Sequence, residues 1–120
     1  MHQVTLAGLT VDTRHYIGGQ RVASDDTFES VSPIDGQVLA HVARGGSAEV
    51  DQAVAAARAA FPGWRDLGAE GRREILHRLA DLVERDLEGL ANLETLDNGS
   101  LLRSHRRGVM PRVAMNLRFF

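Results

Sequence analysis

Two carboxylates near the middle of the C-terminal half are the first candidates for chemistry. The run LETLDNGS (residues 93–100) places Glu94 and Asp97 in the last turn of an expected helix. Carboxylates are mildly unfavourable at this position, because the C-terminal end of a helix carries partial negative charge. Either these two groups are simply solvated, or a positive group or ion lies beside them.

Arg112 is the second candidate. It follows Pro111 and lies between the apolar residues Val109 and Val113. An arginine among apolar neighbours extends its guanidinium to water, pairs with an acidic side chain, or binds an anionic ligand. The last alternative would suit a carboxylate, which the planar guanidinium binds through two parallel hydrogen bonds.

The strongest basic cluster is the run RSHRR (residues 103–107). Its simplest interpretation is a solvated helix face, and the alternative is contact with a partner or a ligand. Nucleic-acid binding is disfavoured, because no aromatic residues alternate with the basic ones and the whole chain has a net charge of −2.

Several other classes of site and location are disfavoured by composition. The chain has no cysteine, which excludes disulfides, thiolate metal sites and a thiol nucleophile from these residues. Its five histidines are never three or four residues apart, and no glycine-rich phosphate-binding motif is present. No apolar run approaches the roughly 20 residues of a membrane span, and the start does not resemble a secretory signal. We therefore expect a cytoplasmic protein with no membrane partner.

Short strands are expected in the first third of the chain. Residues 1–13 show no clear period and are interpreted as a flexible arm. Residues 14–44 read as a small antiparallel unit, in which Gly18 and Gly19 form a tight hairpin turn. Apolar and polar residues alternate in 28–32 and again in 37–44, as they do in half-buried strands.

Three helices are expected to follow. Pro62 should end the first, Gly99 should cap the second, and Pro111 should kink the third. Asp81 and Arg85 should form an ion pair four residues apart. The helices are expected at about 47–61, 69–97 and 101–120. Their apolar faces lack a central sheet within this chain, so we expect it to be part of a longer protein.

Several runs, taken together, resemble the N-terminal part of NAD(P)-dependent aldehyde dehydrogenases in order and spacing. They are YIGGQRV, SPIDGQVLAHVARGG, VDQAVAAARAAFPGW, RLADLVERD and LETLDNG. The resemblance extends from about Tyr16 to Phe120. Within the family, VMPRVAMNLRFF is most similar to the branch that oxidises carboxylated muconic semialdehydes in the catabolism of aromatic compounds.

The resemblance implies an α/β fold and an oxidoreductase. Residues 14–120 would be the N-terminal strands and helices of a Rossmann-like cofactor domain that is incomplete in this chain. The family uses NAD or NADP, a cysteine nucleophile and a glutamate that activates water, and it works as a homodimer or tetramer. The cysteine and the glutamate are not in this sequence, so the resemblance implies that the fragment alone is inactive.

The resemblance also assigns roles to particular residues. Arg112 matches the arginine that meets the substrate carboxylate in the muconic-semialdehyde branch. Met115, Asn116 and Phe119 would lie beside it on the substrate tunnel.

A metal site is the second assignment that the resemblance implies. The aspartate of LDNG joins a monovalent-cation site in many family members. The ligands here would be Asp97, Ser30 and the carbonyl of Val31, holding Na⁺ or K⁺. Such a cation would compensate the carboxylate at the end of the helix.

Two rival hypotheses stay open from the sequence. One is a non-catalytic helical and β interaction module of aldehyde dehydrogenase ancestry. The other, a basic-helix nucleic-acid binder, is the weaker, because the overall charge is slightly acidic.

Overall fold

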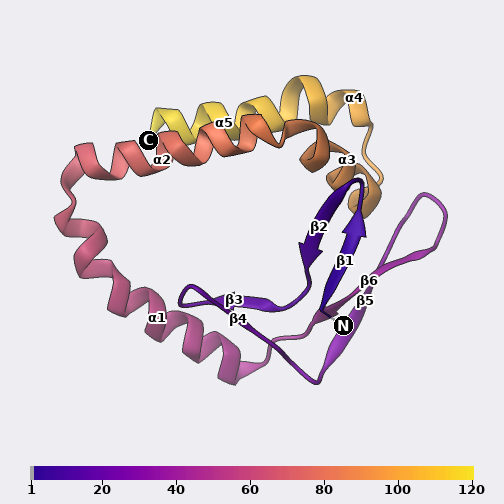
Figure 1. The fold of residues 1–120 in the computed structure, drawn as a ribbon, viewed down its shortest axis with the longest axis horizontal. Coiled ribbons are helices and arrows are strands. Elements are labelled where there is room, and N and C mark those ends of the chain that lie inside the picture. Colours follow the sequence, from indigo (N-terminus) through magenta and orange to yellow (C-terminus); the bar gives the residue numbers. More distant parts are fainter. Residues whose placement is uncertain (1) are drawn as a thin grey trace.

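The computed structural model describes residues 2–120, and in this part the chain forms three antiparallel hairpins followed by helices (Figure 1). The strands are β1 (Gln3–Leu6), β2 (Leu9–Asp12), β3 (His15–Ile17), β4 (Gln20–Val22), β5 (Thr27–Val31) and β6 (Val38–Ala43). The helical elements are α1 (Ser47–Asp66), α2 (Gly68–Arg85), α3 (Leu87–Asn98), α4 (Leu102–Ser104), the π-helical turn η1 (His105–Val109) and α5 (Met110–Phe119). Each sheet contains two strands, so the small single unit expected over residues 14–44 is in fact two separate hairpins.

The first hairpin corrects the expectation of a flexible arm at residues 1–13. β1 pairs with β2 in regular register from Gln3 opposite Asp12 to Leu6 opposite Leu9. Ala7 and Gly8 make the two-residue turn, both with positive φ, 50° and 80°. Two positive φ values are what a tight hairpin turn of this length requires.

The Gly18–Gly19 hairpin is confirmed. Both glycines have positive φ, 58° and 79°, and Ile17 pairs with Gln20 across them. The third hairpin joins β5 and β6, as the alternation of apolar and polar residues predicts, with an irregular register at Ser30 and Val31.

Helix α1 does not end at Pro62 but continues to Asp66. A proline inside a helix removes one hydrogen bond and crowds the preceding turn, yet here the helix tolerates it. Its end comes at Leu67 and Gly68, and Gly68 has a φ of 69°.

The single helix expected at 69–97 is two helices. The break is Asp86, whose backbone angles of −99° and 13° are not helical. Its carboxylate accepts two hydrogen bonds from Arg85, at 2.9 and 2.7 Å. Arg85 is therefore paired with its neighbour and not with Asp81, which corrects the expected ion pair. The cap at the end of α3 is confirmed, since Gly99 has a φ of 76° and donates its N–H to the carbonyl of Thr95 at 2.9 Å.

The irregularity expected at Pro111 takes the form of the π-helical turn η1. Pro111 lies in the first turn of α5, where its missing N–H costs little. The preceding turn widens, and the N–H of Met110 bonds to the carbonyl of His105, five residues back. His105 itself is buried, with 4% of its surface exposed.

Side-chain burial is slight. The fully buried hydrophobic residues of the described chain are three alanines, Ala80 of α2, Ala91 of α3 and Ala114 of α5. The radius of gyration is 16.6 Å, whereas a compact domain of this length has about 14 Å. Figure 1 shows why: α1 and the hairpins lie apart from the layer of α2 and α5. The apolar side chains of these elements are left largely exposed, as expected for helices whose partner surface lies elsewhere.

Helices α2 and α5 run side by side and carry the firmest tertiary contact (Figure 1). Arg118 of α5 donates to Asp81 and to both carboxylate oxygens of Glu84 on α2, each at 2.7 Å. These hydrogen bonds lower the pKa of Glu84 from its ordinary value. In residues 2–120, no helix combines the length and the apolar character needed to cross a bilayer.

Candidate substrate and cation sites

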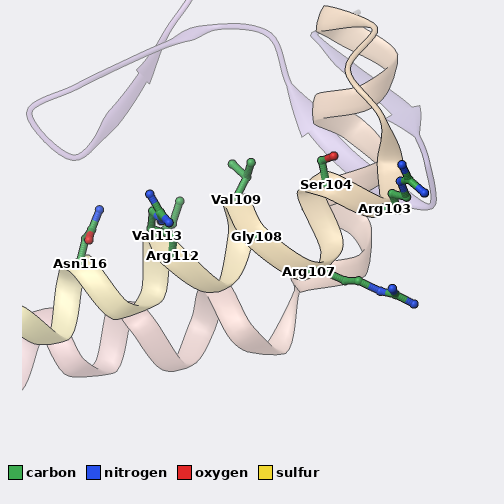
Figure 2. A pocket seen from close by; sticks show the side chains of 8 residues that line it. All are labelled: Arg103, Ser104, Arg107, Gly108, Val109, Arg112, Val113 and Asn116. Carbon is green, nitrogen blue, oxygen red and sulfur yellow. The ribbon is translucent and has the colours of Figure 1, made fainter.

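Arg112 lines a hollow of about 700 Å³ on the surface formed by α4, η1 and α5 (Figure 2). It lies in the first turn of α5, and its neighbours on the wall of the hollow include Val109, Val113 and Asn116. These positions are spaced three or four residues apart, so they share one face of the helix. The guanidinium makes no ion pair or hydrogen bond within residues 2–120. The hollow therefore presents a free cationic donor beside apolar side chains and one amide.

The structure brings only one of the three expected neighbours of Arg112 to this hollow. Asn116 lines it, whereas Met115 and Phe119 do not. Met115 is 67% exposed and Phe119 is 81% exposed. Phe119 instead packs edge-to-face on Phe120, with ring centroids 5.0 Å apart. Their roles on a substrate tunnel stay predictions.

Two arginines from the basic cluster also line the hollow, which is compatible with the alternative of ligand contact that the sequence left open for this cluster. Arg103 and Arg107 join it from α4 and η1, together with Ser104 and Gly108. A beta carbon added at Gly108 would meet nothing within 4 Å, so this part of the hollow is open. Pro111 is the sequence feature nearest to the π-helical turn, but α1 continues past Pro62, so a proline alone does not predict such a turn.

Asp97 and Ser30, proposed above as cation ligands, are in direct contact. Ser30 Oγ donates a hydrogen bond to Asp97 Oδ1 at 2.9 Å, linking β5 to the end of α3. Glu94, the other carboxylate in this turn, accepts from the side-chain amide of Asn98 at 2.9 Å. Within residues 2–120, both carboxylates of the helix end therefore accept a hydrogen bond from a neutral donor. This arrangement is compatible with carboxylates that have no cation beside them, and it is also compatible with the expected cation site.

The chemistry of the donors nonetheless suits a hard cation, which prefers carboxylate, hydroxyl and carbonyl oxygens. The strand register is irregular at Val31, the third expected ligand. Ser30, Glu94 and Asp97 line a cavity of about 280 Å³ between the first hairpin, the third hairpin and α3. No cluster of three or more histidine, aspartate or glutamate side chains suited to a metal occurs in residues 2–120. A cation here would rely on oxygens of other kinds.

The same cavity is closed on one side by the first hairpin. Asp12 at the end of β2 accepts hydrogen bonds from the guanidinium of Arg14 at 3.0 and 2.6 Å and from its backbone N–H at 3.1 Å. These bonds hold the pKa of the Asp12 carboxyl well below its usual range. The carboxylate of Asp12 is thus already neutralised and contributes little attraction for a cation.

Comparison with known proteins gives three informative relatives. The chain is 41% identical over 106 residues to the 5-carboxymethyl-2-hydroxymuconate semialdehyde dehydrogenase of Escherichia coli, covering 88% of this chain and 23% of that protein. It is 42% identical over 106 residues to the 2-aminomuconic semialdehyde dehydrogenase of Bos taurus, with 88% and 22% covered. A solved indole-3-acetaldehyde dehydrogenase in complex with NAD⁺ superposes with a TM-score of 0.87 at 36% identity, covering 92% of this chain and 23% of that one.

The chain thus spans less than a quarter of the length of these relatives. The expected fold class is confirmed, because the hairpins and helices of this chain superpose on part of the solved dehydrogenase, so the chain is an incomplete piece of that α/β fold. The sequence model of the aldehyde dehydrogenase family matches residues 21–120, which is most of the chain. The chain therefore belongs to the aldehyde dehydrogenase family.

Proposed function

We propose that this chain is the N-terminal part of a cytoplasmic NAD(P)-dependent aldehyde dehydrogenase that oxidises a carboxylated, muconic-type semialdehyde to the acid in the catabolism of aromatic compounds. Two of its relatives carry names of muconic-type semialdehyde dehydrogenases. One solved relative holds NAD⁺. In this proposal the full-length enzyme is a homodimer or tetramer.

The observation that carries the substrate class is the unpaired guanidinium of Arg112 in its hollow. A carboxylate remote from the aldehyde would bind this guanidinium through two hydrogen bonds. Such remote binding energy fixes the position of the reacting carbon, which lowers the barrier of the chemical step. Asn116, on the same wall, would donate to or accept from the substrate.

The chemistry itself belongs to residues beyond this chain. The sequence has no cysteine, so a thiol nucleophile has to come from elsewhere in the enzyme, and the proposal assigns no residue of this chain to the nicotinamide cofactor. The chain alone is therefore proposed to be inactive. In the full-length enzyme, Asp97, Ser30 and the carbonyl of Val31 would hold a monovalent cation, which would offset the carboxylate at the end of α3.

The test replaces Arg112 with Met in the full-length enzyme. A hydrogen bond to a charged group contributes about 1.5–3 kcal/mol, so kcat/KM for a carboxylated semialdehyde should fall about 10- to 160-fold. The fall should be much smaller for an aldehyde of similar size without a carboxylate. Arg58→Met is the matched control, because Arg58 lies on α1, away from the hollow, and has no partner within residues 2–120.

Equal losses for the charged and uncharged aldehydes would show that Arg112 acts on folding and not on the carboxylate. A full-length protein that bound no nicotinamide cofactor and oxidised no aldehyde would favour the rival hypothesis of a non-catalytic interaction module.

A further inference from the structure

Helix α5 has two faces with different neighbours. Arg112 and Asn116, four residues apart, are on the face that lines the hollow. Ala114 and Arg118, also four residues apart, share the face that lies against α2 (Figure 1). Arg118 is six residues beyond Arg112, which is about 9 Å along the helix axis and about 120° around it. Arg118 therefore points to α2 and does not line the hollow.

The face of α2 that meets α5 carries the partners of Arg118. Ala80 is fully buried there, and Asp81 and Glu84 follow within four residues of it. The two terminal nitrogens of the Arg118 guanidinium donate to the two carboxylate oxygens of Glu84, each at 2.7 Å. One of these nitrogens also donates to Asp81 at 2.7 Å. The guanidinium thus forms a parallel fork with one carboxylate and bridges to a second.

The buried alanines and the guanidinium fork constrain the two helices in different ways. The small side chains of Ala80 and Ala114 allow the helix axes to come close, but short methyl groups interlock little and leave the position along the axis weakly determined. Hydrogen bonds are directional and weaken steeply as their angle closes. The fork of Arg118 therefore fixes the position of α5 along α2 and its rotation about its own axis. An isolated surface ion pair would contribute little, but a bidentate pair within a network is the exception.

The other end of α5 follows an irregular turn. The helix begins at Met110, directly after the π-helical turn η1, and Arg112 lies in its first turn. A π-helical turn holds one residue more than an α-helical turn does. If η1 changed to a regular turn, α5 would shift by one residue and rotate by about 100°. Arg112 would then leave the wall of the hollow, and all three hydrogen bonds of Arg118 would have to break.

We propose that Arg118 is a positioning residue, which clamps α5 to Asp81 and Glu84 of α2 and so holds the Arg112 guanidinium where the substrate carboxylate binds. This inference rests on the proposed function, which assigns the carboxylate to Arg112 but does not say what holds Arg112 in place. Arg118 itself touches neither the substrate nor the cofactor and acts through α5. A misplacement of about 1 Å can lower a rate about 100-fold, so a clamp outside the site can control selectivity.

The experiment measures kcat/KM of the full-length enzyme for two aldehydes of equal chain length, 6-oxohexanoate, which carries a carboxylate, and hexanal, which does not. The ratio of the two values is the selectivity for the carboxylate. Arg118→Lys keeps the positive charge but cannot form the fork. We expect it to lower the ratio about three- to tenfold. Arg73→Lys is the matched control and should leave the ratio unchanged, because Arg73 pairs with Glu70 on its own helix and joins no second helix.

A double-mutant cycle with Arg112→Met separates positioning from a merely structural role. Without the Arg112 guanidinium nothing is left to position, so Arg118→Lys should change the ratio less than about twofold in that background. Glu84→Gln removes the charge of the acceptor, keeps its size, and should lower the ratio in the same direction. If thermal melts show that Arg118→Lys is misfolded, Glu84→Gln takes its place in the cycle.

The outcomes separate the inference from the proposed function. If Arg118→Lys lowers kcat/KM equally for both aldehydes, or not at all, while Arg112→Met still lowers the ratio, the clamp is refuted and the proposed function stands. An equal fall of the ratio in both backgrounds would show that Arg118 acts independently of Arg112, which also refutes the clamp. If Arg112→Met leaves the ratio unchanged, the proposed function fails and the inference fails with it.

Discussion

Gly89 and Leu9 form the contact through which the first hairpin docks on α3. A beta carbon built on Gly89 would lie 2.8 Å from Cγ, Cδ1 and Cδ2 of Leu9. Contacts this short require Leu9 to move, and its Cγ moves only if the side chain changes its χ1 rotamer or the backbone shifts. Gly89→Ala should therefore weaken the docking of the hairpin, even though alanine is the better helix former.

The magnitude follows from two opposing effects. Gly89 is the third residue of α3, so the gain from alanine is at most the value of about 1 kcal/mol that holds for an interior helical position. Overpacking a filled contact costs about 1–3 kcal/mol. The net effect of Gly89→Ala is then a loss of about 0–3 kcal/mol, and a loss of 1 kcal/mol raises the equilibrium constant for local opening about fivefold.

The assay is hydrogen exchange of the amides of β1 and β2 in the full-length enzyme, which reports local opening. The variants form a double-mutant cycle with Leu9→Ala, whose smaller side chain leaves room for the new methyl group. In that background Gly89→Ala should become neutral or protective, giving a coupling energy of about 1–3 kcal/mol. Gly63→Ala in α1 is the control, because its beta carbon would meet nothing within 4 Å.

Equal acceleration of exchange by Gly89→Ala in the wild-type background and in the Leu9→Ala background would refute the reasoning, since the clash would then not be the cause. Unprotected amides throughout β1 and β2 in the wild type would restore the flexible arm that the sequence suggested.

The remaining predictions concern the surroundings of the cation site and can be checked in the full-length enzyme. Gly99→Ala should destabilise the end of α3 by about 1 kcal/mol or more, measured by hydrogen exchange, because its φ is 76° and a beta carbon would lie 3.0 Å from the neighbouring proline ring. The folded-state pKa of Asp12 lies below its unfolded value of about 3.9, so its bond to Arg14 stabilises the hairpin fully above that pH and is lost as the pH falls below it. Asp12→Asn should remove this acid dependence from the exchange of β2; an identical pH profile in the variant would refute it. Asp97→Asn should abolish any rise of Tm with added Na⁺ or K⁺, while Ser30→Ala should reduce it; a response that survives in Asp97→Asn would place the cation elsewhere.

The elements that local chemistry specifies were predictable. Gly18 and Gly19 form their hairpin because two residues with positive φ and no side chain suit a two-residue turn. Gly99 caps α3 for the same conformational reason. The first hairpin was missed because Ala7, at φ 50°, occupies a position that usually holds Gly, Asn or Asp. A signal was present, since Val4, Leu6, Leu9 and Val11 alternate with more exposed residues on either side of the turn.

The features that depend on tertiary contacts were not predictable from spacing. Asp81 was expected to pair with Arg85, but Arg118 from α5 reaches it across the helix pair. Similarly, Arg112 was identified as a candidate from its apolar neighbours, whereas the π-helical turn that carries Arg107, another lining residue of the hollow, was not expected. A helical wheel with a constant 3.6-residue period cannot show that change of face.

The wall of the hollow holds its positive charge in guanidinium groups, which stay protonated at every pH that a cell experiences. Lysine in their place would have been open to acetylation, and histidine would have discharged near neutrality. A carboxylic acid that binds in the hollow will therefore lose affinity only when its own carboxylate is protonated. The pH dependence of its affinity would then report the titration of the ligand and not that of the protein.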